Sequence, residues 1–246
     1  MRRALVLAAA LGVSAAGMGT AQGMNVTVQS GGKAYASYLA APPNTANTAK
    51  RPAVILIHSF NGLEQGYKDL TDDLASQGFV TLALGWQTFE KEPSDAAVAQ
   101  LVQDGVKSLT ARGDVDAGRL GLTGFCAGGR YTMLFLPQSK TFKAGVAWYG
   151  FPDQGGTALK PQKPVDVLSQ LSVPLLIIHG TRDQVSPIAT IYDYAQKLDA
   201  ANKFFELKVY QGEAHGFYLK DGRVANTFAA RDARDEMVSF FRKTLR

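Results

Sequence analysis

The chain has 246 residues, 46% of them hydrophobic and 19% charged, and a formal net charge of +5 at pH 7. This length suits one α/β domain with a substantial core. Its single cysteine excludes an internal disulfide. The basic residues are scattered without a clustered run, which argues against nucleic-acid binding and against strong attraction to anionic surfaces.

The first 21 residues predict an export signal. A basic start, Met1-Arg2-Arg3, leads into an apolar stretch that ends in the small residues Gly19-Thr20-Ala21. The stretch is too short and too rich in alanine for a membrane span, and no other segment reaches the necessary length. We therefore expect a secreted or periplasmic protein that starts near Gln22 and forms one domain over residues 22–246, free of the membrane after signal removal.

Strand and helix patterns alternate along the rest of the chain. Buried strands are predicted from continuous apolar runs, and helices from apolar residues at helical spacing. In chain order we expect a strand hairpin at 25–29 and 33–39, a loop at 41–50, a strand at 53–57, a helix at 67–77, a strand at 79–84, a helix at 96–110, a strand at 120–123, a helix at 128–136, strands at 144–148 and 174–178, a helix at 187–198, a strand at 205–209 and a helix at 227–245.

This alternation predicts the fold class. Strand–helix–strand units give a mostly parallel central sheet with helices on both faces, and they gather the active groups at the C-terminal ends of the strands. The N-terminal hairpin is expected to lie antiparallel on one edge. The proline-containing segment 151–173 shows little periodicity and is expected to pass over the site between two strands.

The cysteine lies in a motif of its own, directly after the predicted strand 120–123. Cys126 is the third residue of Gly124-Phe125-Cys126-Ala127-Gly128. This is the GxCxG form of the nucleophile elbow, a sharp strand-to-helix turn that lifts the nucleophile clear of the sheet. Glycines flank the nucleophile because the turn crowds the neighbouring backbone. We therefore interpret Cys126 as a nucleophile.

Two further residues complete a candidate triad at the ends of later strands. Asp183 follows one strand in His179-Gly180-Thr181-Arg182-Asp183, and His215 follows the next in Gly212-Glu213-Ala214-His215. The chain order of nucleophile, acid and histidine is that of the α/β-hydrolase fold, and it differs from the order in the two serine protease folds. Asp153 is the nearest rival for the acid.

The cysteine elbow, HGxxD at Asp183 and EAHGF at His215 resemble the dienelactone hydrolase family over about residues 24–243. The resemblance implies an α/β-hydrolase fold with Cys126 as nucleophile, His215 as base and Asp183 as the residue that orients it. The oxyanion would be met by the backbone N–H groups of Phe60 and Ala127, the latter at a helix start that favours negative charge.

The chain departs from the family pattern at three positions. Ser59 stands where the family has a glutamate that holds the resting thiol, so thiolate formation would rest on His215 and the helix terminus. Phe89 and Leu219 stand where the dienelactone-cleaving members have two arginines that bind the substrate carboxylate. We therefore expect a neutral substrate.

Aromatic and histidine side chains follow several of the strand ends. Five of them are candidates for lining an apolar pocket, with ordinary packing as the equal alternative: Phe60, Trp86, Trp148, Tyr149 and Phe217. Of these, Trp86, Trp148 and Phe217 are expected to bind the substrate. His58 and His179 are interpreted as hydrogen-bonded loop anchors. The dispersed histidines and the lone cysteine argue against a zinc site.

Taken together, the residues predict a carboxylic ester or lactone hydrolase that forms an acyl-cysteine intermediate. It would act on a small molecule without cofactor or metal, as a monomer or small homo-oligomer. One alternative is a secreted binding protein with a vestigial site, which Ser59 favours and the intact Cys126, Asp183 and His215 oppose. A peptidase or acyltransferase is the other; the lack of an extra propeller or cap domain argues against the peptidase.

Overall fold

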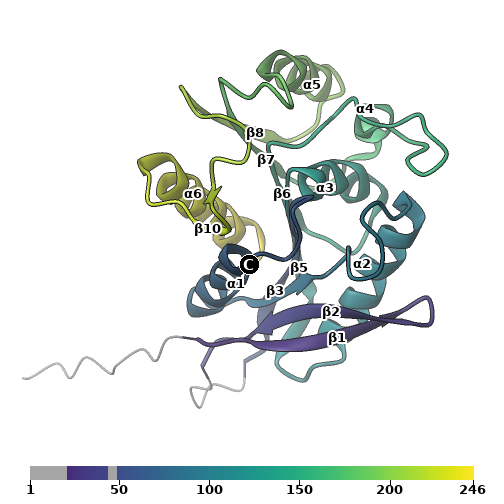
Figure 1. The fold of residues 1–246 in the computed structure, drawn as a ribbon, viewed down its shortest axis with the longest axis vertical. Helices are drawn as coiled ribbons and strands as arrows, with labels where there is room; N and C mark the ends of the chain where they lie inside the picture. Colours follow the sequence, from purple (N-terminus) through teal and green to yellow (C-terminus); the bar gives the residue numbers. More distant parts are fainter. Residues whose placement is uncertain (1–20, 44–48) are drawn as a thin grey trace, which may run out of the picture.

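An eight-stranded sheet forms the centre of the protein (Figure 1). The computed structural model describes residues 21–43 and 49–246, so the predicted export signal lies outside the described residues except for Ala21. The strand order is β1-β2-β4-β3-β5-β6-β7-β8. These strands are β1 (Met24–Ser30), β2 (Lys33–Ala40), β3 (Arg51–Ile57), β4 (Val80–Leu84), β5 (Val115–Phe125), β6 (Ala144–Trp148), β7 (Leu175–Gly180) and β8 (Phe205–Tyr210).

The pairing confirms the predicted sheet. Strands β3 to β8 pair with one another in parallel. The hairpin of β1 and β2 is antiparallel and adds to one edge through β2 and β4. Parallel neighbours need crossover connections, which the helices between the strands provide.

Helices cover both faces of the sheet because the buried strands are apolar on both sides. In β3, Ile55 and Ile57 pack with α2, α3 and α5, whereas Val54 and Leu56 pack with α1 and α6. Figure 1 shows α1 and α6 on one side of the sheet and α2 and α3 on the other. The helices are α1 (Gln65–Ser76), α2 (Asp95–Thr110), α3 (Ala127–Gln138), the short α4 (Pro164–Val167), α5 (Ile188–Ala200) and α6 (Phe228–Thr244), with a 3₁₀ turn at Leu168–Gln170.

Most boundaries differ from the predicted ones by one or two residues, for local reasons. Pro187 and Thr227 were expected inside helices and are instead the N-caps of α5 and α6. The Thr227 side chain accepts from the N–H of Ala230 at 3.1 Å, as expected of a threonine cap.

Two features of the strands were not predicted, one in the central sheet and one in a separate two-stranded sheet. Strand β5 starts at Val115, five residues before the predicted start. Its pairing with β3 shifts register between Arg51 and Ala53. The polar Asp116 and the glycine Gly118 interrupt the apolar pattern in this part of the strand, so the sequence did not indicate it. A small second hairpin, β9 (Leu219–Lys220) and β10 (Arg223–Val224), follows the predicted histidine loop. Its two-residue strands are too short to show any alternation.

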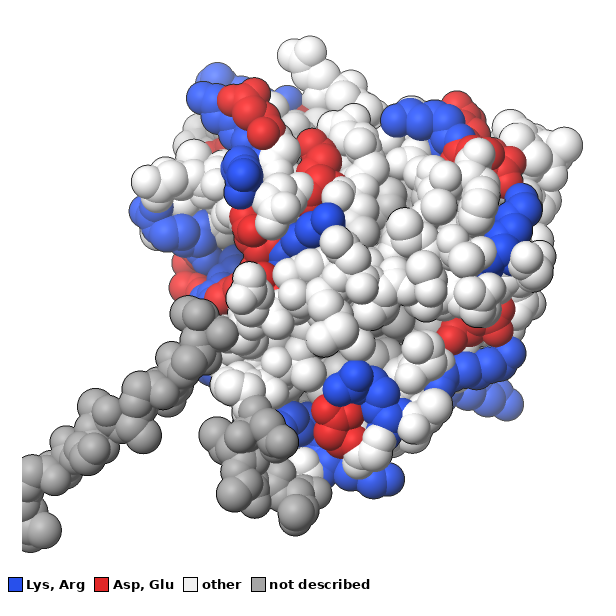
Figure 2. Space-filling model, turned by 60° about the horizontal axis from the view of Figure 1, so that its bottom comes forward, with Lys and Arg blue, Asp and Glu red and all other residues white. Residues whose placement is uncertain are grey.

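The sheet brings distant loops to one edge. The parallel strands all end on the same side, so the loops after β3, β5, β6, β7 and β8 meet there. On the face in Figure 2, Lys and Arg side chains lie among Asp and Glu side chains instead of forming one basic patch. Within the described ranges, no helix combines the length and apolarity needed to cross a bilayer.

Candidate active site

Cys126 occupies a strained turn between β5 and α3. Its backbone angles are φ 56° and ψ −113°, and its N–H donates to the carbonyl of Trp148 at 3.0 Å. The space around the turn is closed. A Cβ on Gly128 would lie 2.0 Å from the carbonyl oxygen of Ile57, and one on Gly124 would lie 2.1 Å from that of Gly128. The glycines therefore allow the backbone approach that holds Cys126 in this unusual conformation.

Asp183 and His215 are joined side chain to side chain. His215 Nδ1 and Asp183 Oδ2 are 2.7 Å apart. The other carboxylate oxygen accepts from the N–H groups of Val185 at 2.9 Å and Ser186 at 2.7 Å. Asp183 is buried, so these contacts fix the carboxylate, and the carboxylate in turn fixes the imidazole ring.

The protonation of the pair follows from these contacts. Burial lowers the pKa of His215, but the hydrogen bond to Asp183 and the interaction with Cys126 outweigh it and raise the pKa to about 9. Burial opposes ionisation of Asp183, yet the hydrogen bonds from His215 and Ser186 leave its pKa below the usual value. Nε2 of His215 has no well-aligned hydrogen-bond partner in the described structure, although the thiol of Cys126 is near enough to affect the ring. The free nitrogen is thus available for proton transfer.

One cavity contains both Cys126 and His215. Its volume is about 590 Å³. Rings surround the histidine: the centroid of Tyr149 lies 5.1 Å and that of Phe151 5.5 Å from the imidazole centroid. The other residues on the walls include the apolar or aromatic Phe60, Tyr67, Ala127, Val185 and Leu219, the polar Ser59, Asn61 and Gln154, and the charged Glu64, Glu92, Lys160 and Asp221.

Two backbone donors are available in the cavity that contains Cys126. Phe60 and Ala127 both line the cavity, and neither N–H has a hydrogen-bond partner within the described ranges. Ala127 is the first residue of α3, where the first-turn N–H groups have no intrahelical acceptor and carry partial positive charge. These are the two residues that the family resemblance selects.

The three predicted aromatic substrate contacts are not at this cavity. Trp148 is fully buried and stacks on Phe125, with ring centroids 4.7 Å apart, while Trp86 stacks on His58 at 5.3 Å. Phe217 is also buried, near Trp148. The assignment of these three as lining residues was wrong. Trp148 is the last residue of β6 and points into the core beside α6, so the following residue, Tyr149, reaches the cavity instead.

The remaining candidates lie outside the cavity. Asp153 is exposed and does not line it. His179 Nε2 contacts the carbonyl of Ser186 at 2.8 Å and lies 3.4 Å from Asp183 Oδ2, so it braces the acid loop. Burial lowers its pKa and keeps the ring neutral.

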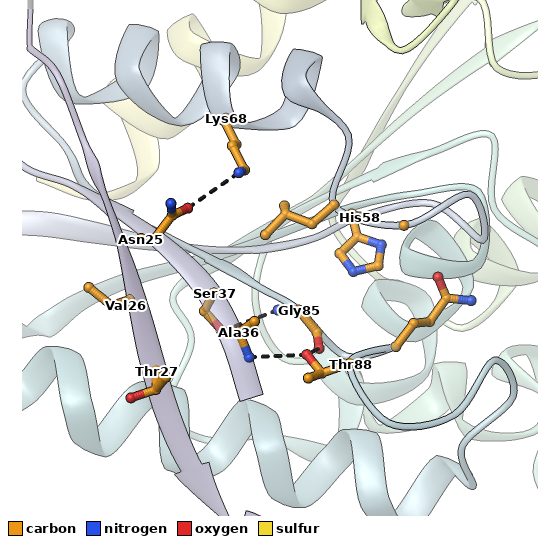
Figure 3. Close-up of a pocket in the computed structure, with 12 residues that line it drawn as sticks. Asn25, Val26, Thr27, Ala36, Ser37, His58, Lys68, Gly85 and Thr88 are labelled. Carbon is orange, nitrogen blue, oxygen red and sulfur yellow. Dashed lines mark hydrogen bonds between the residues drawn. The ribbon is translucent and has the colours of Figure 1, made fainter. Parts of the chain in front are cut away.

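His58 faces a different cavity, of about 750 Å³, next to the N-terminal hairpin. Figure 3 shows His58 with other residues that line this cavity, among them Gly85, whose N–H donates to the side-chain oxygen of Ser37 at 3.2 Å. His58 Nδ1 contacts the carbonyl of Ser59 at 2.7 Å, and burial lowers its pKa to about 4. This larger cavity contains neither Cys126 nor His215, so the candidate chemistry belongs to the smaller one.

Sequence reasoning missed several wall residues. Tyr67 was predicted only as the first residue of a helix. Phe151, Gln154 and Lys160 belong to the segment 151–173 that was expected to pass over the site, but its lack of periodicity did not single them out. Across the described residues, no group of three or more His, Cys, Asp or Glu side chains is arranged to hold a metal ion.

The fold and the site together define a class of protein. A mostly parallel sheet with an elbow after β5, an acid after β7 and a histidine after β8 is the α/β-hydrolase arrangement. A solved structure from Klebsiella pneumoniae subsp. pneumoniae MGH 78578, provisionally named a dienelactone hydrolase, superposes with a TM-score of 0.83 and 27% identity. The match covers 92% of this chain and 100% of the other.

Sequence relatives narrow the class to a family. Residues 83–245 match the sequence model of the dienelactone hydrolase family. A protein of Methylorubrum extorquens, provisionally named a carboxymethylenebutenolidase, is 31% identical over 78% of this chain and 72% of its own length. One of Bradyrhizobium sp, provisionally named a 2-oxo-3-(5-oxofuran-2-ylidene)propanoate lactonase, is 30% identical over 88% and 92%. The chain belongs to the dienelactone hydrolase family, and it is a hydrolase of the carboxylic ester class, which includes lactonases.

Proposed function

We propose that this enzyme hydrolyses a neutral carboxylic ester or lactone through a Cys126, His215 and Asp183 triad. The observation that carries the proposal is the shared cavity: the strained elbow presents Cys126 in the same space as a histidine whose ring is locked to a buried carboxylate. Nucleophile, base and orienting acid in this arrangement are the parts that acyl transfer requires.

The first half of the reaction is acylation. His215, oriented by Asp183, takes the proton of the Cys126 thiol, and its raised pKa of about 9 favours this transfer. The thiolate attacks the carbonyl carbon, and the oxyanion accepts hydrogen bonds from the N–H groups of Phe60 and Ala127. Collapse of this intermediate breaks the carbon–oxygen bond. The departing alkoxide takes the proton from His215 and leaves an acyl-thioester.

The second half is hydrolysis of the thioester. His215, now neutral, takes a proton from water as the water oxygen attacks the acyl carbon. The second tetrahedral intermediate expels the Cys126 thiolate and releases the carboxylic acid. One ester and one water are thus converted to one acid and one alcohol, and both side chains return to their starting state.

Ser59 does not replace the glutamate that the family has at this place. Its side-chain oxygen accepts from the N–H of Asn61 at 3.2 Å, so it stabilises its own turn. Activation of the thiol then depends on His215 and on the positive end of α3.

The charges of the cavity support a neutral substrate. Three carboxylates, those of Glu64, Glu92 and Asp221, face one lysine on the walls. That lysine, Lys160, lies 3.7 Å from Glu92 and is therefore partly neutralised. Leu219 adds an apolar surface at a position where the family resemblance would place a substrate-binding arginine. Phe89, at the other such position, is exposed and does not line the cavity. An anionic substrate would meet net repulsion here.

The triad is tested with Cys126→Ala and His215→Ala on nitrophenyl esters. Each change should lower kcat/KM by about a thousandfold or more, because triad members act as a unit. Wild type should release a burst of nitrophenol equal to the enzyme concentration. Turnover that persists in Cys126→Ala would contradict the triad, and an absence of turnover in wild type would instead favour a non-catalytic binding protein.

The substrate charge is tested with a matched pair, the nitrophenyl esters of hexanoic acid and of the glutaric half-acid. We expect kcat/KM to favour the neutral ester by about tenfold at low salt and by less at high salt, because salt screens surface charges. The double change Glu64→Gln and Asp221→Asn should narrow the preference. Asp193→Asn, on the exposed surface of α5, is the control. An equal or higher rate with the anionic ester would contradict the proposal.

A further inference from the structure

We propose that Lys91 is a positioning residue that holds the Phe60 side of the oxyanion hole. The inference rests on the proposed function, because it concerns how one of the two backbone donors is kept in place. Lys91 lies in the loop after β4, outside the candidate triad and outside the walls of the catalytic cavity.

Lys91 contacts Phe60 in two ways. Its Nζ donates a hydrogen bond to the carbonyl oxygen of Phe60 at 2.7 Å. The same ammonium lies 4.4 Å from the centroid of the Phe60 ring, within cation–π distance. The first contact holds the peptide group that follows the Cα of Phe60, and the second holds its ring. Together they restrict rotation about the backbone bonds of Phe60, and with it the direction of the Phe60 N–H.

The rest of this loop is organised around Ser59. The N–H groups of Asn61 and Gly62 both donate to Ser59, at 3.2 Å each, and His58 Nδ1 contacts the Ser59 carbonyl. None of these bonds involves a polar atom of Phe60. Within the described structure, Lys91 is the hydrogen-bond partner of the Phe60 carbonyl, and the Phe60 N–H is left free.

Lys91 is itself fixed, and its charge is not neutralised. The side chain of Gln87 donates to the Lys91 carbonyl at 2.8 Å, which closes the loop after β4 on itself. No carboxylate in the described ranges lies within ion-pair distance of Nζ. The positive charge of Lys91 acts on the loop after β3. Burial is the larger cause of the lowered pKa of His58, and the charge of Lys91 lowers it further. It therefore adds positive potential where the oxyanion develops.

This arrangement acts on the transition state and not on the nucleophile. An oxyanion donor contributes only once the carbonyl oxygen becomes negative, so loss of its support should lower kcat and leave KM nearly unchanged. Alkylation of Cys126 by iodoacetamide uses the same thiolate but forms no oxyanion. The alkylation rate is therefore a measure of the nucleophile that the oxyanion hole does not influence.

The experiment compares Lys91→Met with Lys91→Arg and with Lys33→Met. Lys33 is a matched control, since it lies 5.4 Å from the Phe89 ring and 4.0 Å from Glu90 on the same loop but touches no part of the site. For Lys91→Met we expect kcat for a neutral nitrophenyl ester to fall about tenfold, a part of the 10²–10³ that removal of a donor costs. KM and the iodoacetamide rate should stay within about twofold of wild type. Lys91→Arg should retain most of kcat, and Lys33→Met all of it.

Three results would overturn the inference: an unchanged kcat in Lys91→Met, a fall in kcat matched by an equal fall in alkylation rate, or an equal effect of Lys33→Met. The thermal midpoint of Lys91→Met should equal that of wild type, because the side chain is exposed. Wild-type turnover that does not depend on Cys126 would refute the proposed function itself, and this inference with it.

Discussion

At the scale of single residues, the pKa of the His215 imidazole is set by burial and by two neighbouring side chains, which have opposing effects. Burial disfavours the charged ring, whereas the carboxylate of Asp183 and the thiol of Cys126 favour it. The favourable contacts prevail because the carboxylate is fixed at 2.7 Å and cannot turn away. The imidazole is therefore expected to hold a proton at neutral pH, and Asp183 helps to set the pH at which that proton is lost.

A pH profile tests this account. As the pH rises through about 9, His215 loses the proton that it must give to the leaving group, so kcat/KM for a neutral ester should fall. Asp183→Asn removes the charge that raises the pKa, and the alkaline limb should move to lower pH. Asp153→Asn, at an exposed position outside the cavity, should leave the limb in place. An alkaline limb that does not move in Asp183→Asn would contradict the assignment.

The same shift links stability to pH. The folded pKa of His215 lies above its usual 6.5, so its contribution to stability is complete below pH 6.5 and is lost as the pH rises through about 9. The pKa of Asp183 lies below its usual 3.8, so its contribution is present above that pH and is lost as the pH falls through the lower, folded value.

At the scale of elements, the elbow depends on close contact between α3 and the end of β3. The first turn of α3 carries no side chain at Gly128, and this lets the helix backbone approach Ile57. The contact brings the start of α3, with its free N–H at Ala127, next to the loop that contains Phe60. The positions of both proposed oxyanion donors therefore depend in part on the packing of this helix on this strand.

Gly128→Ala tests the element. The added Cβ would lie 2.0 Å from the Ile57 carbonyl oxygen, and neither backbone can move without separating α3 from β3. We expect a loss of about 3 kcal/mol or more in the free energy of unfolding, measured by denaturant titration. Gly113→Ala meets nothing within 4 Å and is the control, with an expected change within about 0.5 kcal/mol. Equal stability of the two variants would show that the contact is not needed.

The elements also show which local signals were sufficient. Strands β3, β6 and β7 and helices α2 and α6 have long apolar patterns, and these were predicted to within two residues. The hairpin of β9 and β10 was not predicted, since two-residue strands carry no periodicity and form only where Gly66 of α1 lies against Val224.

At the scale of the whole molecule, family membership and substrate preference are decided by different parts of the protein. The chain matches the dienelactone hydrolase family in sequence over residues 83–245, and a solved structure provisionally named a dienelactone hydrolase in fold. The charged residues around the cavity lie in three loops and in the β9–β10 turn, and none of them belongs to the central sheet. Substitutions in these loops could therefore change the preferred charge of the substrate without altering the fold.

We also propose that the protein is exported and that cleavage follows Ala21. Gly23 donates through its N–H to Asp72 at 2.8 Å, and β1 starts at Met24, so a chain that starts at Gln22 retains these contacts. Mass spectrometry of the protein from an exporting host should give a mature start at Gln22. The 22–246 chain made directly should match its ester turnover and thermal midpoint. Recovery of the uncleaved chain in the cytoplasmic fraction would contradict the proposal.

The sequence by itself determined the order of strands and helices, the elbow at Cys126 and the strand-end loops of Asp183 and His215. These features are local: apolar periodicity and the spacing of glycines around a nucleophile can be recognised within a dozen residues. Only the tertiary structure decided that Tyr149 and not Trp148 faces the cavity, because the direction of a strand-end side chain depends on what packs against each face. It alone brought Lys91 to Phe60, since a contact between two loops depends on the neighbouring positions of β3 and β4 in the sheet.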